Sequence, residues 1–155
     1  MKVQINSAAL EKIREHSASS DQEVAGLLIG QFKDDVLVIT QVATGSQIGT
    51  AASVELSADV QGQLAEKLIE GNENQSIVGW YHSHPRLGVF MSGTDVRTQT
   101  NYQAYFPHAV GLVIDPSKSD FKVFQVSDGR YHELVTETVR NDTEIAKKLT
   151  SEQKD

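Results

Sequence analysis

Residues 77–85 join an apolar run to two closely spaced histidines. The run covers residues 77–81 and reads Ile-Val-Gly-Trp-Tyr, which is typical of a buried β-strand. Because successive side chains of a strand point to opposite faces, His82 and His84 share one face and Ser83 lies on the other. Pro85 cannot donate a hydrogen bond to a sheet, so the strand is expected to end there. The sequence therefore predicts a buried strand that brings two imidazoles together at its end.

A third side chain able to bind a metal follows after a loop. Asp95 lies near the start of a polar helix expected over residues 95–106. Two histidines and one carboxylate, with a fourth position left for water, form a catalytic zinc arrangement. A His-x-His pair at a strand end also arises by chance, and the pair alone is more often an ordinary strand end than a metal site. The spacing of Pro85, Ser92 and Asp95 after the pair favours the metal site.

Composition restricts the chemistry and the partners. A chain of 155 residues is long enough for one domain with a substantial core. It has no cysteine, so any zinc must be held by His, Asp or Glu. The net charge of -7 argues against nucleic-acid binding. No apolar run approaches the roughly 18 residues of a membrane span, and the first residues lack a signal-peptide pattern, so we expect no membrane association and a cytoplasmic protein.

Apolar periodicity predicts alternating strands and helices in a single domain over residues 1–140, followed by a polar tail over residues 141–155 that can form a short helix. Strands are expected at 3–5, 23–30, 36–43, 77–81, 109–114, 121–126 and 131–135, and helices at 8–16, 57–70 and 95–106. His16 is expected at the solvated end of the first helix.

Two further polar residues have both an ordinary and a functional interpretation. Glu23 opens an apolar strand, where a carboxylate costs free energy unless it is exposed, paired or close to a cation. Its position alone favours a solvated strand start, and the functional alternative is a carboxylate that faces the water of the metal site. Ser92 stands just before a helix, where a serine is often a cap, and position alone favours that interpretation.

Taken together, these residues resemble the motif of the JAMM (MPN+) metalloprotease family. That pattern is an upstream Glu, then His-Ser/Thr-His-Pro, then a Ser and an Asp. It stands here as Glu23, then His82-Ser83-His84-Pro85, then six residues, then Ser92-Gly93-Thr94-Asp95. The residues at 79–81, 95–99 and 113–116 are also similar to the proteasome-lid deubiquitinase and its signalosome relative, so the resemblance covers roughly residues 3–126.

The resemblance implies an α/β fold, namely a three-layer, cytidine-deaminase-like MPN domain whose curved mixed β-sheet is flanked by helices. It also implies zinc-dependent hydrolysis of the isopeptide bond between the C-terminal glycine of ubiquitin, or a ubiquitin-like modifier, and a lysine. By position, His82, His84 and Asp95 would bind one Zn²⁺. Glu23 would be the general base, and Ser92 would steady the developing oxyanion.

The family resemblance also implies where a substrate would lie and which partners to consider. Residues 45–56 map onto a flap against the modifier's extended tail, with Val54 and Phe90 expected near that tail. The implied partners are ubiquitin or ubiquitin-like conjugates, with a proteasome-type complex or another MPN subunit as further candidates. Two alternatives stay open: a protease that processes modifier or sulfur-carrier precursors, and a scaffold of the same fold without catalysis.

Overall fold

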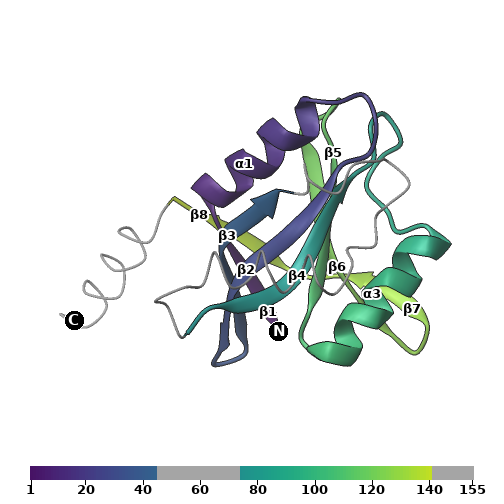
Figure 1. Cartoon of the computed structure of the whole chain (residues 1–155). Helices are drawn as coiled ribbons and strands as arrows, with labels where there is room; N and C mark the ends of the chain where they lie inside the picture. Colours follow the sequence, from purple (N-terminus) through teal and green to yellow (C-terminus); the bar gives the residue numbers. More distant parts are fainter. Residues whose placement is uncertain (45–73, 141–155) are drawn as a thin grey trace.

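The computed structural model describes residues 1–44 and 74–140 (Figure 1). Val54, the expected flap, the expected helix at 57–70 and the polar tail all lie outside the described residues. Neither of the helices in the described ranges combines the length and the apolar character needed to cross a membrane.

A curled, mixed β-sheet organises the described part of the chain (Figure 1). Its strands lie in the order β7-β6-β5-β4-β2-β3-β1-β8. Their bounds are β1 Lys2–Asn6, β2 Ala25–Lys33, β3 Val36–Thr44, β4 Ser76–Ser83, β5 Val110–Asp115, β6 Asp120–Ser127, β7 Arg130–Glu133 and β8 Thr136–Val139. Strand β1 runs parallel to β3 and β8, β4 runs parallel to β5, and the other neighbours are antiparallel. Strand β4, which contains His82 and ends just before His84, lies between β5 and β2 in the middle of the sheet.

Within residues 1–44 and 74–140, one helix lies on each face of this sheet. Helix α1, Ser7–Ala18, begins at the cap Asn6, and helix α3, Gly93–Tyr105, begins at the cap Ser92. The alternation along β4 separates two cores, because Tyr81 packs in the core that contains α1, whereas Trp80 packs with partly buried residues of α3. The three layers are thus α1, the sheet and α3, as the family resemblance implies.

The structure corrects the expected end of strand β2. Gly30 was expected to end the strand, yet β2 continues to Lys33, with a register shift against β3 between Ile29 and Gly30. A Cβ on residue 30 would lie 1.7 Å from the carbonyl oxygen of Val38. The glycine is therefore needed for the close approach of β3 at an irregularity and does not mark a strand end.

Two other expectations differ from the structure. His16 was expected to be solvated, but its Nδ1 lies 2.7 Å from the hydroxyl oxygen of the buried Tyr81. The last strand was expected over residues 131–135. The structure ends it, as β7, at Glu133 and adds β8, which pairs parallel to β1 at the other edge of the sheet. Both differences arise from contacts between residues far apart in the sequence, which local periodicity does not encode.

Candidate metal centre

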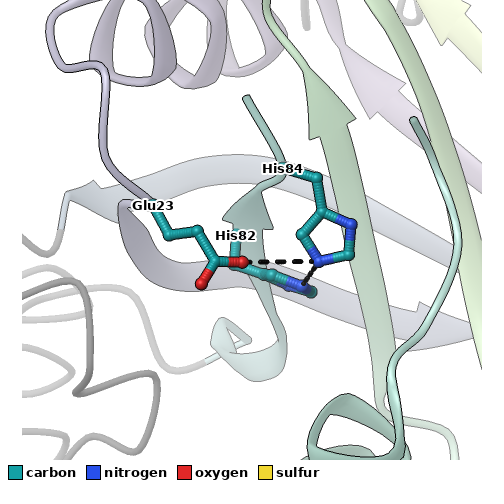
Figure 2. Close-up of side chains that lie close together, drawn as sticks. All are labelled: Glu23, His82 and His84. Atoms are coloured by element: carbon teal, nitrogen blue, oxygen red, sulfur yellow. Dashed lines mark hydrogen bonds and ion pairs between the residues drawn. The ribbon is translucent and has the colours of Figure 1, made fainter. Parts of the chain in front are cut away.

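The two histidines converge at the end of β4, as strand alternation predicts. His82 is the next-to-last residue of the strand, and His84 is held beyond it by a bond of 2.8 Å from its backbone N–H to the carbonyl oxygen of Ile114. Both imidazoles are buried, at 0% and 3% exposure. Their Nε2 atoms lie 2.9 Å apart (Figure 2). Two imidazole nitrogens therefore face a common point.

Asp95 completes a triangle of three donor atoms. Its Oδ2 lies 3.0 Å from Nε2 of His82 and 3.1 Å from Nε2 of His84. A tetrahedral zinc site with zinc–ligand distances of about 2.0–2.1 Å has ligand atoms roughly 3.3 Å apart. The three observed separations come within about 0.4 Å of that spacing. The donor set and its geometry fit a zinc ion.

Glu23 lies beside this triangle, on the segment just before β2. Its Oε1 is 3.5 Å from Nε2 of His84, and its side chain remains 34% exposed (Figure 2). Together with His82 and His84 it offers ligand atoms that all lie within 4.8 Å of one another. The Asp95 carboxylate lies closer to Nε2 of His84 than the Glu23 carboxylate does, and of these two carboxylates only that of Glu23 is open to solvent.

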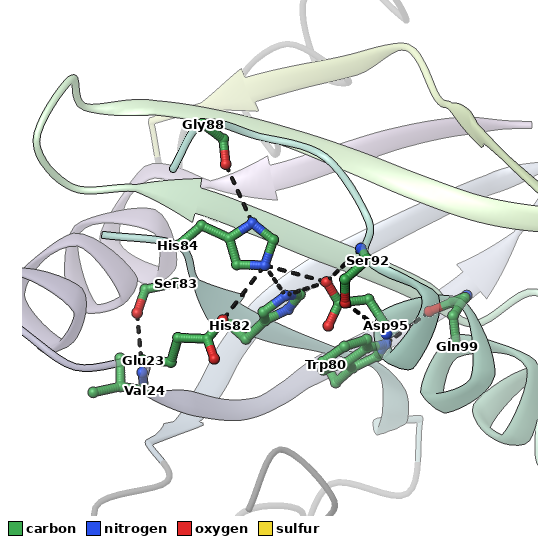
Figure 3. A network of polar contacts seen from close by, with 10 residues as sticks. All are labelled: Glu23, Val24, Trp80, His82, Ser83, His84, Gly88, Ser92, Asp95 and Gln99. Carbon is green, nitrogen blue, oxygen red and sulfur yellow. Dashed lines mark hydrogen bonds and ion pairs between the residues drawn. The ribbon is translucent and has the colours of Figure 1, made fainter. Parts of the chain in front are cut away.

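Ser83 fixes the segment that carries Glu23. Its hydroxyl accepts a 2.9 Å hydrogen bond from the backbone N–H of Val24, and its own N–H donates to the carbonyl oxygen of Val24 at 2.9 Å (Figure 3). The pairing of Ala25 with His82 continues this contact into the sheet. Sequence reasoning placed Ser83 on the opposite face and gave it no part in the site. Nothing in its local spacing identifies the residue that it contacts.

Ser92 caps helix α3 with Asp95 as its partner. The Ser92 hydroxyl accepts from the Asp95 backbone N–H at 3.1 Å, and the Ser92 N–H donates to Asp95 Oδ2 at 2.9 Å. The cap predicted from position is confirmed. It uses the hydroxyl as an acceptor, which leaves the hydroxyl proton available for donation. The cap also orients the Asp95 carboxylate toward the histidines.

The charges in the site support one another. Burial alone would raise the pKa of Asp95, but hydrogen bonds from both imidazoles, the charge of His82 and the Ser92 N–H hold that pKa well below its ordinary value. Burial alone would lower the pKa of His84, but Asp95, the charge of Glu23 and the Gly88 carbonyl raise it above its ordinary value. The site thus keeps a carboxylate and favours a positive charge beside it, which a metal ion or a proton supplies.

The ring of His82 is oriented by an aromatic neighbour. Trp80 stacks on it with ring centroids 4.6 Å apart and an interplanar angle of 5°. The indole N–H of Trp80 donates to Oε1 of Gln99 at 2.7 Å, and Nε2 of Gln99 donates to the carbonyl oxygen of Ala109 at 2.8 Å (Figure 3). From the sequence, Trp80 was expected in a buried strand and Gln99 in a polar helix, but no contact of either with the site was predicted. Trp80 precedes His82 by two residues on the same strand, so strand alternation could have predicted that the two rings lie on the same face.

Phe90 also lies at the site. Its ring centroid is 4.8 Å from that of His84, and its side chain is partly exposed. The loop before α3 therefore places an apolar surface beside the imidazoles, where the family resemblance expects a substrate tail. Val54, the other residue expected there, lies outside the described residues.

Comparisons with known proteins agree with this architecture. A solved structure, the solution structure of protein DSY2949 from Desulfitobacterium hafniense, matches with a TM-score of 0.69 over 90% of this chain and 94% of that one, at 23% identity. Among curated proteins, the ubiquitin carboxyl-terminal hydrolase RPN11 of Saccharomyces cerevisiae is 41% identical over 120 residues. The 26S proteasome non-ATPase regulatory subunit 14 of Drosophila melanogaster is 40% identical over 120 residues.

Each of these two curated alignments covers 76% of this chain but only 39% of the relative, so the chain spans about two fifths of their length. The model of the family described as JAB1/Mov34/MPN/PAD-1 ubiquitin protease matches residues 1–108. That match covers most of the chain and includes the two histidines, the two carboxylates and the capping serine. The chain belongs to the JAB1/Mov34/MPN/PAD-1 ubiquitin protease family.

Proposed function

We propose that this chain is a zinc-dependent isopeptidase that cleaves ubiquitin, or a ubiquitin-like modifier, from a substrate lysine. The observation that carries the proposal is the triangle formed by Nε2 of His82, Nε2 of His84 and Oδ2 of Asp95, with edges of 2.9, 3.0 and 3.1 Å. The partly exposed carboxylate of Glu23 lies next to it. The similarity to a ubiquitin carboxyl-terminal hydrolase supports the choice of substrate, and the similarity to a 26S proteasome subunit makes a proteasome-type complex a proposed partner.

Each residue of the site has a distinct role in this proposal. His82, His84 and Asp95 hold the zinc ion, which when bound supplies a Lewis acid that polarises the scissile carbonyl and acidifies water. Glu23 takes a proton from the attacking water and delivers it to the lysine amine as the isopeptide bond breaks. The exposed side of the Glu23 carboxylate allows water to reach it, and the bonds of Ser83 to Val24 keep it in position.

Ser92 stabilises the negative charge that develops on the carbonyl oxygen. Its hydroxyl accepts from the Asp95 N–H in the helix cap, so its own proton can point toward the oxyanion. Removing one oxyanion donor typically costs about 10²- to 10³-fold in rate. The cap and the oxyanion role use different parts of the same hydroxyl and are compatible.

The direct test is cleavage of a ubiquitin isopeptide conjugate, measured with and without a zinc chelator and together with the metal content. We expect release of free ubiquitin, loss of that release on chelation, recovery on adding zinc, and about one zinc per chain. A linear ubiquitin fusion serves as the comparison substrate. Cleavage of the linear fusion alone would indicate a processing protease. Stoichiometric zinc without cleavage of ubiquitin or ubiquitin-like conjugates would contradict the proposal and favour the scaffold.

Two substitutions of Ser92 separate its two roles. Ser92→Ala removes both the oxyanion donor and the cap, whereas Ser92→Gly removes the donor and keeps most of the capping preference. We expect both variants to lose about 10²- to 10³-fold in kcat. We expect only the alanine variant to lose about 0.5–2 kcal/mol in the free energy of unfolding, measured by urea denaturation. A glycine variant with normal kcat would remove Ser92 from the chemistry and leave it as a cap.

A further inference from the structure

A second buried carboxylate, Asp115, lies at the end of β5, outside the donor triangle. It is 0% exposed. Its Oδ1 accepts from the backbone N–H of Arg86 at 3.1 Å, and its Oδ2 accepts from that of Gly88 at 2.9 Å. The N–H and the hydroxyl of Ser117 also donate to Oδ1, at 3.0 and 2.6 Å. These donors together hold the pKa of Asp115 down to about 2, the Ser117 hydroxyl contributing most, so the group is a carboxylate at neutral pH.

The N–H groups of Arg86 and Gly88 belong to a loop whose backbone conformation is unfavourable by itself. Arg86 has φ of 65° and Gly88 has φ of 91°, so both adopt the left-handed region that an arginine rarely occupies. A single carboxylate from another strand binds the N–H groups of both residues. The bonds of Asp115 thus compensate for an unfavourable backbone conformation and fix the course of the loop that follows His84.

The same loop holds the ring of His84. The carbonyl oxygen of Gly88 lies 3.2 Å from Nδ1 of His84 (Figure 3). A carbonyl can only accept, so the neutral imidazole must carry its proton on Nδ1 to make this bond, and Nε2 then presents a lone pair. Gly88 therefore connects two groups: its N–H binds Asp115, and its C=O binds His84.

We propose that Asp115 is a positioning residue that sets the tautomer and orientation of His84 through Gly88. The inference rests on the proposed metal-binding role of His84 and adds a residue that has no contact with the metal-binding atoms. Partners of this kind typically change metal affinity by about 10- to 100-fold when they are replaced. Since Asp115 acts through one intervening residue, we expect an effect at the lower end, about 10-fold.

Two variants and one control test the proposal. In Asp115→Asn only one side-chain oxygen can accept, so in either orientation of the amide one loop N–H, that of Arg86 or that of Gly88, loses its acceptor. Gly88→Ala keeps the Asp115 carboxylate. The added Cβ meets no atom within 4 Å, but alanine is strained at a φ of 91°. We expect the backbone to relax and to move the carbonyl group of residue 88 away from His84. The control, Ser117→Ala, removes one bond to Asp115 without touching the loop. Circular dichroism and urea unfolding establish that each variant is folded.

Zinc affinity is measured by competition with a chromophoric chelator, and the His84 tautomer is measured by ¹⁵N NMR of the metal-free protein above the His84 pKa. We expect Asp115→Asn and Gly88→Ala each to weaken zinc binding about 10-fold and to move His84 away from the Nδ1–H tautomer. We expect Ser117→Ala to match the unmodified chain. If one of these two variants does not fold, the zinc affinity and the His84 tautomer of the other variant test the proposal.

Affinity and tautomer both unchanged in the folded variants would overturn the role of Asp115. The zinc affinity of the unmodified chain tests the proposed function separately. If that chain binds no zinc, the metal site is contradicted. The tautomer of His84, read without metal, would still decide whether Asp115 positions it.

Discussion

Replacing Glu23 with glutamine should lower turnover by about 10²- to 10⁴-fold while leaving zinc binding and folding unchanged. Glutamine keeps the size of the side chain but cannot take a proton from water. Oε1 of Glu23 lies 3.5 Å from Nε2 of His84, farther than Oδ2 of Asp95 at 3.1 Å. The substitution therefore leaves the donor atoms of His82, His84 and Asp95 in place. The measurement is the initial rate of conjugate cleavage by protein with one equivalent of zinc, together with the zinc affinity.

A matched control for this substitution is Glu11→Gln, the same chemical change on an exposed position of α1. We expect the control to cleave at the normal rate. Full activity in Glu23→Gln would remove Glu23 from the mechanism. A large loss of zinc affinity would instead make Glu23 a metal ligand, which its proximity to both histidines makes a meaningful alternative.

Local sequence patterns predicted that His82 and His84 lie together because their relative placement depends on local strand geometry. Strand alternation places His82 and His84 on one face whatever the rest of the fold does, and both point to one site. The serine before a helix predicted the cap that orients Asp95. The shared face of the two histidines and the helix cap therefore follow from two short segments.

The position of Glu23 could not be predicted from such patterns. It reaches the site because β2 pairs with β4 so that Ala25 faces His82, a contact between segments almost sixty residues apart in sequence. Periodicity predicts that a segment is a strand but not which strand pairs with it or in what register. Position alone accordingly favoured a solvated strand start, and only the family resemblance indicated the site.

The supporting polar contacts were missed for the same reason. Asp115 directly follows the strand expected over residues 109–114, and in the structure its carboxylate binds the loop after His84. Gln99 belongs to a polar helix, yet its side chain is fully buried against the indole of Trp80. A buried polar group needs a partner, but the sequence does not name that partner. Residues that contact the two histidines or the loop after them from other segments are thus the part of this site that requires a structure.

Replacing Asp95 with alanine should have the largest effect on the metal. It removes the oxygen that lies 3.0 and 3.1 Å from the two imidazoles, so zinc affinity should fall by more than the roughly 10- to 100-fold typical of an outer-shell partner. Conjugate cleavage should be lost at limiting zinc. The substitution also leaves the Ser92 N–H without its acceptor, which should cost about 1 kcal/mol in the free energy of unfolding.

The control must separate these two effects. Ser92→Ala damages the same helix cap from the other side and leaves the Asp95 carboxylate in place, so we expect nearly normal zinc affinity in that variant. Chelator competition on both variants provides the comparison. If Asp95→Ala retains normal affinity, then Glu23 must supply the third ligand beside His82 and His84, and a Glu23→Gln, Asp95→Ala double variant should then lose the zinc. If the single variant loses the zinc while Glu23→Gln keeps it, the two carboxylates have separate roles: Asp95 holds the metal, and Glu23 is left to move the proton.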